Sequence, residues 1–590
     1  MPGRILSKLL LAGSLALTAS IGCQGGCQRG SSPRGRPTEG AAPARGGNLR
    51  IATFSDLRSL DPAVAMDTES QPYLNLMFAG LVDYDQRGNV VGDLAERFER
   101  SDDGLSYRFF LRHGVTMHDG TELVADDVKR SIERTLSPDT PCPAITFYER
   151  IAGLESFRAR KTQHLDGVVV EGPHLVTIKL SSKDATFLPA LALPFLRPVC
   201  KSAGEKYDDS FQNQPCGAGP FKFDAWQPGR LLRVRRFEGS YLANQTWLDT
   251  IELSMDVSRL TQRFMLERGE LDAIFNEFDR PGAIWFRTHP EWSKYFREAT
   301  EPGVYGDFMN TELRPFDDRR IRQAVASAIN RENLQRYYQG WTLVTGHLIP
   351  PGIPGHETHV PYEQKFDLAR ARALMAEAGY AYDPASGKGG WPEPIVYHAG
   401  EGEAAVRYAQ LLQFDLAKIG IRIEIKEASF SQYLAVTGRP KTAQMGYAGW
   451  LLDYADASDF FEPILTTRSI AEEDSQNKAF YSNPTLDSLI DAAHVEMDQE
   501  KRLAMYRKAE QIVCEDAPWS FTYYPLRLEL LQPWVRGYAA HPIWYRQFKP
   551  VWIDQAARRS AFALLGPGRA TSALGVLMRD LGTHKQEPAR

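Results

Sequence analysis

The sequence predicts an α/β protein built from two or three domains. A chain of 590 residues is too long for one compact hydrophobic core. From Asn48 onward, short stretches with strand-like alternation and stretches with helical spacing follow one another in mixed order. A predicted helix over 411–419 breaks at Gly420 and runs into an alternating strand over 421–426, which is the unit from which α/β sheets are built.

The N-terminus has the pattern of a bacterial secretory signal. Arg4 and Lys8 precede an apolar run from Leu9 to Ala19 that is short for a membrane span. Residues 20–23 resemble the lipobox of bacterial lipoproteins, although Ser20 stands where leucine is usual. We therefore expect residues 1–23 to be a lipoprotein signal peptide with its lipobox, and Cys23 to carry a lipid anchor.

Two segments have compositions that do not favour a packed core. Residues 24–47 are rich in Gly, Pro, Arg and Ser, and predict a flexible tether. Residues 554–590 mix arginines with one apolar patch, and we expect this tail to be disordered or weakly helical.

Export would also allow cysteines to pair, and Cys200 with Cys216 is the preferred disulfide.

Between these segments, periodicity predicts individual elements. Alternation over 105–111 and over 176–180 predicts two half-buried strands. Asp126 or Asp127 is expected to cap a helix that buries Val128 and Ile132, and Asp317 or Asp318 to cap a helix over 321–329. A helical stripe over 368–378 ends at Gly379, a natural C-terminal cap.

Charge and motifs argue against several classes of protein. With 69 basic and 74 acidic residues the net charge is -5, so no global field attracts nucleic acid. The basic stretch 231–237 alternates like a strand with one solvated face. No nucleophile elbow occurs, residues 386–390 lack the upstream glycine of a P-loop, and HETH at 356–359 is one residue short of the zinc motif. We expect no catalysis, no metal and no cofactor.

Residues 449–461, GWLLDYADASDFF, mix aromatic side chains and carboxylates unusually closely. A core strand would avoid the acids, and a solvated loop would have little use for Trp and Phe. Taken alone, the stretch fits a loop held by aromatic anchors.

Seven further segments resemble, in order, the large solute-binding proteins of peptide ABC transporters, the family of oligopeptide-, dipeptide- and nickel-binding proteins. The longest begins at Leu60-Asp61-Pro62 and continues over 76–134, and the resemblance covers about residues 48–553. The remaining matches are 215–229, 266–274, 310–334, 366–380, 416–425 and 501–519. Within 215–229, Ala218 replaces a threonine often found in the family.

The resemblance implies a two-lobed, periplasmic-binding-protein-like α/β fold of the type II, large cluster C form, with an extra domain in the first lobe. Closure would occur about strands that connect the lobes. The implied boundaries are a lobe I core of 48–84, 216–305 and 527–553, an extra domain of 85–215, and a lobe II of 306–526.

The resemblance also implies a peptide site. In peptide-binding members a G-W-x-x-D-Y segment lines the ligand chamber and its aspartate pairs with the α-ammonium group, which here gives Trp450, Asp453 and Tyr454 as ligand residues. Asp456 and Asp459 are expected to be solvated or capping. In the first lobe, Met66, Asp67 and Thr68 are candidates for contacts to peptide backbone, and structural loop residues are an equally good interpretation. Arg407 is a candidate for the ligand carboxylate.

The resulting interpretation is a monomeric, lipid-anchored receptor on the periplasmic or cell-surface face of a bacterial membrane. It would capture peptides by hinge closure and deliver them to an ABC permease and its ATPase. The alternatives are a receptor of the same fold for a nickel complex or a sugar, a receptor that signals without transport, and an exported hydrolase, for which no catalytic constellation is recognisable.

Overall fold

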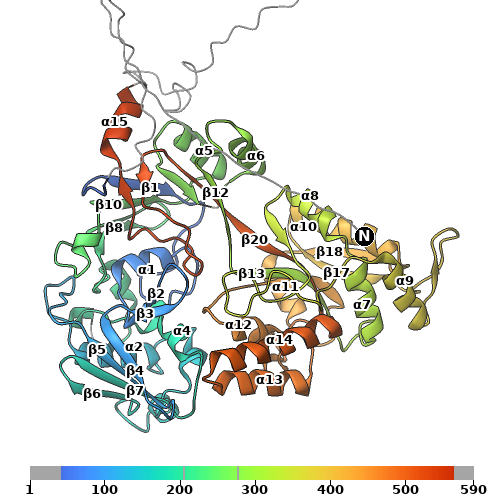
Figure 1. The fold of residues 1–590 in the computed structure, drawn as a ribbon, viewed down its shortest axis with the longest axis horizontal. Helices are drawn as coiled ribbons and strands as arrows, with labels where there is room; N and C mark the ends of the chain where they lie inside the picture. The colour runs from blue at the N-terminus through green and yellow to red at the C-terminus, as the bar shows by residue number, and fades with distance from the viewer. Residues whose placement is uncertain (1–41, 204–205, 276–277, 564–590) are drawn as a thin grey trace, which may run out of the picture. The chain divides into compact units, whose positions relative to one another are not determined.

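The computed structural model of the chain describes residues 42–203, 206–275 and 278–563 (Figure 1). The predicted signal peptide, Cys23 and residues 24–41 of the predicted tether lie outside the described residues, as does the tail beyond residue 563. In the part of the chain that is described, no helix combines the length and the apolar character needed to cross a membrane.

A four-stranded sheet pairs the first strand of the described chain with a strand about 200 residues later, since Asn48 lies opposite Thr250. Its strand order is β1-β10-β9-β8, with β1 parallel to β10 and the other pairs antiparallel. Helix α1 (Gln71–Met77) packs beside β8, and a buried apolar cluster fills the space. The strands are β1 (Asn48–Ala52), β8 (Phe221–Gln227), β9 (Leu231–Arg236) and β10 (Thr250–Ser254).

A second, antiparallel sheet lies within the predicted extra domain. Its order is β4 (Ala95–Arg100), β5 (Ser106–Leu111), β7 (Leu175–Lys179), β6 (Val168–Gly172), which confirms the two strands predicted from alternation. Helix α2 (Ala125–Leu136) covers it and buries Val128 and Ile132 as predicted. The predicted cap is wrong in detail, because Val124 is the N-cap and Asp127, in the first turn, accepts its N–H at 3.2 Å.

An eight-stranded sheet draws its strands from residues 273–531 and is built around one long strand, β20 (Trp519–Leu531). The main path is β11-β20-β13-β19-β17-β18, and β12 and β14 also pair with β20. One end of β20 therefore pairs with strands of predicted lobe I and the other with strands of predicted lobe II. The partners are β11 (Ala273–Phe275), β12 (Phe296–Thr300), β13 (Gly303–Met309), β14 (Thr342–Val344), β17 (Ile395–Gly400), β18 (Ile423–Ala428) and β19 (Met445–Leu451).

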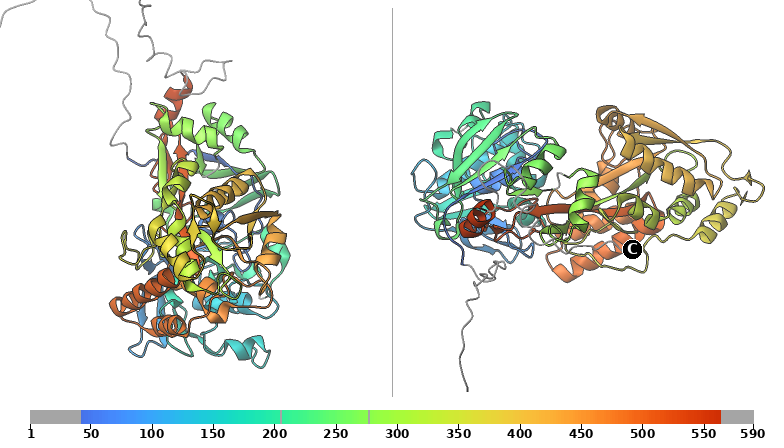
Figure 2. Two further views of the ribbon diagram at one scale, coloured as in Figure 1. Left: turned by 90° about the vertical axis from the view of Figure 1, so that its right-hand side faces the viewer. Right: turned by 90° about the horizontal axis from the view of Figure 1, so that it is seen from above.

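Successive side chains of β13 point to opposite faces of the sheet, and the two faces pack into two different hydrophobic clusters. Val304 and Phe308 pack into the cluster that includes helices α12 to α14, and Met309 packs into the cluster that includes α7, α9 and α10. Figures 1 and 2 let the reader follow these two helical layers. Their bounds are α7 (Arg319–Ala328), α8 (Arg331–Tyr338), α9 (Leu368–Glu377), α10 (Glu403–Ala417), α12 (Ser458–Leu465), α13 (Pro484–Val495) and α14 (Gln499–Asp516).

The predicted helix ends in this region are confirmed. Asp318 caps α7 by accepting the N–H of Arg320 at 2.8 Å. Gly379 follows α9 with a φ of +92°, and Gly420 follows α10 with a φ of +80° before the chain enters β18. Glycine is suited to both positions because it adopts positive φ without steric cost.

Smaller elements complete the fold. Helix α15 (Gln555–Ala563) occupies the start of the tail, for which we expected disorder or weak helix, and agrees with the helical alternative: Asp554 accepts the N–H of Ala557 at 3.0 Å and Ala561 is buried in the core. The others are α3 (Leu154–Arg158), α4 (Phe187–Leu191), α5 (Arg259–Glu267), α6 (Arg280–Thr288), α11 (Phe430–Thr437), and the strand pairs β2–β3 (Val82–Tyr84, Val90–Gly92), β15–β16 (Tyr382–Asp383, Lys388–Gly389) and β21–β22 (Val535–Arg536, Trp552–Ile553).

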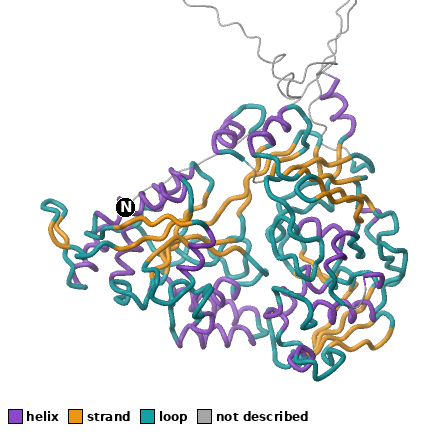
Figure 3. Tube along the Cα trace, turned by 180° about the vertical axis from the view of Figure 1, so that it is seen from behind, coloured by secondary structure: helices purple, strands orange, loops and turns teal. Residues whose placement is uncertain are grey.

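The extra domain and the helices α12 to α14 share one buried core. Figure 3 shows the chain trace of both regions from behind. Further contacts join predicted lobe I to the loop before α12. The hydroxyl of Tyr84, at the end of the first segment of the predicted lobe I core, accepts the N–H of Ala455 at 3.3 Å, and in the extra domain the ring of Phe147 lies 5.4 Å from that of Tyr454. On α13, His494 lies 3.1 Å from Asp184 of the extra domain. The hydrophobic core therefore runs across the predicted boundary between these regions.

Candidate functional site

The stretch that mixes aromatics and carboxylates forms the end of β19, a loop over 452–457 and the first turn of α12. β19 is antiparallel to β13, with Trp450 opposite Val304, and the N–H of Leu452 extends the ladder to the carbonyl of Pro302 at 2.9 Å. Gly449 lies opposite Tyr305, where a Cβ atom would come within 2.1 Å of the tyrosine ring. The glycine is therefore required by close packing on the strand that presents Trp450.

Asp459, in the first turn of α12, holds this loop in place. Its Oδ2 accepts the backbone N–H of Asp453 at 2.9 Å and the indole N–H of Trp450 at 3.3 Å. Only 2% of Asp459 is exposed. One buried carboxyl thus fixes both residues that the sequence predicts as the chief ligand contacts.

The electrostatics of Asp453 and Asp459 are those of a site without a cation. Burial raises the pKa of Asp453 to about 6. Burial, and next the charge of Asp453, raise the pKa of Asp459 well above its usual value. Across the described ranges of the chain, no Arg, Lys or His side chain forms an ion pair with either carboxyl. A buried carboxylate without a partner is costly, and a cationic ligand group would remove that cost.

The two aromatic residues predicted beside Asp453 differ in their surroundings. Trp450 is half-buried against the core, and its indole N–H is directed to Asp459. Tyr454 is buried, its ring packs on Phe147, and its hydroxyl bonds that of Ser458 at 2.9 Å. Because these contacts occupy both ring and hydroxyl, Tyr454 fits a packing role better than a ligand contact.

The expectation that Asp456 and Asp459 are solvated is wrong, since each is only 2% exposed. Asp456 forms an ion pair with Arg502 and accepts the hydroxyl of Tyr506 at 3.0 Å, both from α14. It also accepts the N–H of Ser458 at 3.0 Å, so the capping alternative is correct for this residue. The sequence offered no sign of these partners, which lie about 50 residues further along the chain.

The lobe I candidates lie in the loop that leads into α1. Met66 and Thr68 are exposed, with 43% of Met66 accessible. Asp67 supports the start of the helix, because its Oδ1 accepts the N–H of Ser70 at 2.8 Å. Its other oxygen, Oδ2, is buried and has no hydrogen-bond partner within the described part of the chain. This loop thus offers both a structural role and one unused buried acceptor.

Arg407, the candidate partner of the ligand carboxylate, pairs with a residue of its own helix rather than with the other candidate ligand residues. It projects from α10 with 59% of its side chain exposed and pairs with Glu403, one turn earlier, at 2.5 Å. This is an ordinary surface pair within a helix. The geometry gives no support to Arg407 as the partner of a ligand carboxylate.

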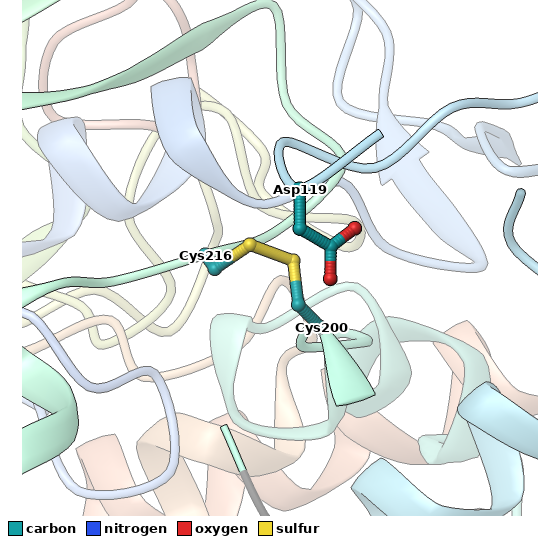
Figure 4. Close-up of side chains that lie close together, drawn as sticks. All are labelled: Asp119, Cys200 and Cys216. Carbon is teal, nitrogen blue, oxygen red and sulfur yellow. A yellow bond between two sulfur atoms is a disulfide. The ribbon is translucent and has the colours of Figure 1, made fainter. Parts of the chain in front are cut away.

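Cys200 and Cys216, the pair preferred from the sequence, are joined by a disulfide with a Cα–Cα distance of 5.4 Å. Figure 4 shows the carboxyl of Asp119 beside it. The three residues bring possible metal-ligand atoms together, but sulfurs bonded to each other are not thiolate ligands. Both ring nitrogens of nearby His118 are engaged, by the carbonyl of Gly219 and the N–H of Gly217. We therefore interpret the Cys200–Cys216 disulfide and Asp119 as a structural group.

Two surface cavities lie elsewhere. One of about 410 Å³ is lined by Arg314, Tyr380 and Trp391, among others. The other, of about 1270 Å³, runs between α2 and β6 and carries side chains of both charges, including Lys129, Glu133 and Arg160. The predicted ligand residues line neither of these cavities.

Comparisons with known proteins agree on a binding protein. The family model for bacterial extracellular solute-binding proteins, family 5 Middle, matches residues 89–472. The chain is 28% identical over 476 residues to the glutathione-binding protein GsiB of Salmonella choleraesuis (strain SC-B67), covering 80% of this chain and 87% of that protein.

Solved structures show the same fold. The clavulanic acid biosynthesis oligopeptide binding protein 2 aligns with a TM-score of 0.77 at 22% identity, covering 86% of this chain and 96% of that one. The oligopeptide-binding protein AppA from Bacillus subtilis, solved in complex with a nonapeptide, aligns with a TM-score of 0.67 at 23% identity, covering 87% of this chain and all of that one. The predicted two-lobed α/β binding-protein fold is confirmed. Because the family model covers more than half of the chain, the chain belongs to the bacterial extracellular solute-binding proteins of family 5.

Proposed function

We propose that this solute-binding protein is the receptor of an ABC importer and that it captures short peptides by their α-ammonium group. The observation that carries the proposal is Asp453, a half-buried carboxyl that has no cationic partner among the described residues and is fixed beside Trp450. An ammonium group at hydrogen-bonding distance supplies the missing charge, and the indole supplies an apolar wall.

The rest of the proposed site lies in the loop before α1. Met66, Asp67 and Thr68 would contact the peptide from the first lobe, and the unused Oδ2 of Asp67 supports a donor on that side. β20, which pairs with strands of both predicted lobes, is a natural hinge strand. Closure about it would bring the two sets of residues onto one ligand, which would then stabilise the closed form.

The proposed cellular setting follows from the N-terminal sequence. Acylation at Cys23 would tether a monomer to the periplasmic or cell-surface face of a bacterial membrane. The predicted tether over 24–47, whose last residues Arg45 to Gly47 bond to residues 243–249, would let it reach the permease. Both features are proposals that accompany the family assignment.

Native mass spectrometry tests the ligand class. The protein lacking residues 1–27 is purified without denaturant, and bound molecules are released and identified. We expect a set of short peptides with free N-termini. A metal chelate, a sugar or a lipid would keep the fold and overturn the peptide proposal. If the protein is empty, thermal shift with trialanine and with reduced glutathione, the latter suggested by the name of the GsiB relative, replaces the release experiment. No shift with either would also count against the proposal.

A further inference from the structure

Tyr84, at the end of β2, contacts the loop of Asp453 from the other predicted lobe. Its hydroxyl accepts the N–H of Ala455 at 3.3 Å, although the two residues lie 371 positions apart in the chain. Only 4% of Tyr84 and 5% of Ala455 are exposed. A buried backbone N–H needs a hydrogen-bond partner, and here predicted lobe I supplies the partner for a loop of predicted lobe II.

Predicted lobe I holds this hydroxyl in a fixed orientation. A tyrosine hydroxyl has one hydrogen to donate and lone pairs with which to accept. The hydroxyl of Tyr84 donates to the carbonyl of Pro189 at 2.8 Å, which leaves a lone pair for the N–H of Ala455. The ring packs edge-on against that of Trp544 at 5.5 Å, and the indole N–H of Trp544 donates to Asp83 at 2.8 Å. The acceptor therefore does not depend on lobe II for its orientation.

A second contact from lobe I reaches the neighbouring residue of the same loop. The ring of Phe147, in the short 3-10 helix Ile145–Tyr148 of the extra domain, lies 5.4 Å from the ring of Tyr454 in an edge-to-face arrangement. Tyr454 directly follows Asp453, and Ala455 comes next. The two residues after the proposed ammonium partner are thus both contacted from the opposite lobe.

We propose that Tyr84 is a positioning residue for Asp453, and that its bond to Ala455 forms when the lobes close and slows the release of the ligand. Asp459 holds Asp453 from within lobe II, whereas Tyr84 holds the loop only when the lobes meet. Opening breaks this bond and exposes the N–H of Ala455 to water. The inference rests on the proposed function, because it requires Asp453 as a ligand contact and closure about β20.

Tyr84→Phe tests the proposal because it removes the hydroxyl and keeps the ring. The matched control is Tyr148→Phe, since Tyr148 is 1% exposed and its hydroxyl donates to the carbonyl of Ala190 at 2.9 Å, a bond that stays within the extra domain. Stopped-flow tryptophan fluorescence measures association and release of trialanine and of reduced glutathione. We expect Tyr84→Phe to release the probes about three- to tenfold faster, the size expected for one hydrogen bond, with association unchanged. Tyr148→Phe should leave both rates unchanged.

Two further measurements separate positioning from a merely structural role. In a double-mutant cycle, Tyr84→Phe should have little further effect on release once Asp453→Asn is present, because Tyr84 acts through Asp453. Small-angle X-ray scattering measures closure, and the radius of gyration of the wild type should fall when a probe binds. A merely structural Tyr84 would lower the urea midpoint, as Tyr148→Phe should, and leave release unchanged.

Each outcome decides a separate point. Unchanged release by Tyr84→Phe, an equal effect of Tyr148→Phe, additive effects in the cycle, or a radius of gyration that binding does not alter would overturn the inference and leave peptide binding intact. If Tyr84→Phe does not fold, Phe147→Leu takes its place, and it should also speed release because it removes the ring contact with Tyr454. If the wild type binds neither probe, the proposed ligand class fails and the inference fails with it.

Discussion

Within ten residues, the chain contains two pairs of carboxyls, each made of one buried and one half-buried residue, that differ in one respect. Asp456 and Glu462 have cations, supplied by Arg502 and by His494, the latter 2.7 Å from Glu462. Asp453 and Asp459 have none among the described residues, although Asp459 is as deeply buried as Asp456. Both pairs are held by the same helix, α12, and by the loop before it.

The difference separates a stabilising role from a binding role. A carboxylate paired inside the protein lowers the free energy of the folded state relative to the unfolded one only as long as its partner stays in place. A buried carboxyl left without a cation destabilises the empty protein, and that cost is recovered only when a ligand brings the charge. Asp453 and Asp459 fit the second description.

Arg502→Ala should produce the largest effect on stability. Removing the cation leaves Asp456 buried and uncompensated, which costs about 3–5 kcal/mol in the free energy of unfolding. Urea denaturation measures the loss. The matched control is Arg439→Ala, whose partner Glu473 is 72% exposed and whose loss should cost at most about 1 kcal/mol. Equal losses in the two variants would remove the distinction between the paired group and an ordinary surface pair.

Asp453→Asn should lower peptide affinity and leave the stability of the protein intact, the opposite of the effect expected for Arg502→Ala. Loss of one charge-assisted contact costs about 1.5–3 kcal/mol of binding free energy, which lowers peptide affinity ten- to a hundredfold. The urea midpoint should stay unchanged or rise, because the variant removes a half-buried charge without a partner. Calorimetry and denaturation on the same preparation check both expectations. Lower stability with unchanged affinity would assign Asp453 to the structural group.

His494→Gln should sharpen the comparison through pH. Burial opposes protonation, but hydrogen bonds to Asp184 and Glu462 outweigh it and raise the pKa of His494 to about 9. A folded pKa above the unfolded value near 6.5 gives stability that is fully present below pH 6.5 and is lost as pH rises through 9. Wild type should therefore lose about 1–3 kcal/mol over that interval, and the variant should not.

The control for this pH experiment is His164→Gln, since His164 is 70% exposed and pairs with Glu133. Its urea denaturation should follow the wild-type pH dependence. A wild type whose stability is flat between pH 6.5 and 9 would show that His494 is not charged between its two carboxylates.

Arg407→Ala should give the smallest effect. Its helix-surface pair with Glu403 contributes about 0.3–0.5 kcal/mol, and peptide affinity should stay within twofold of wild type. Calorimetry with the same peptide measures this. A tenfold loss of affinity would restore Arg407 as a ligand contact.

The sequence predicted the fold far better than the environments of single acids. Periodicity located β5, β7, α7 and α9, and the family resemblance supplied the fold class. The sequence could not show that Asp456 is buried, because Arg502 and Tyr506 approach this residue only through the packing of α14 on α12. Nor could it show the role of Asp459, whose two contacts depend on how α12 turns back on the loop. The apolar Phe460 and Phe461 that follow Asp459 were the only signal that this acid lies at a buried helix start.

The most direct test of the account compares a peptide recovered from the protein with its N-acetylated form, on wild type and on Asp453→Asn. Calorimetric affinities of the four combinations form a cycle that isolates the contact between the ammonium group and the carboxyl. We predict that acetylation weakens binding to wild type by at least tenfold and has little further effect on the variant. An acetylated peptide that binds the wild type as tightly as the free one, or an equal loss in both proteins, would contradict the claim that Asp453 awaits the ligand's charge.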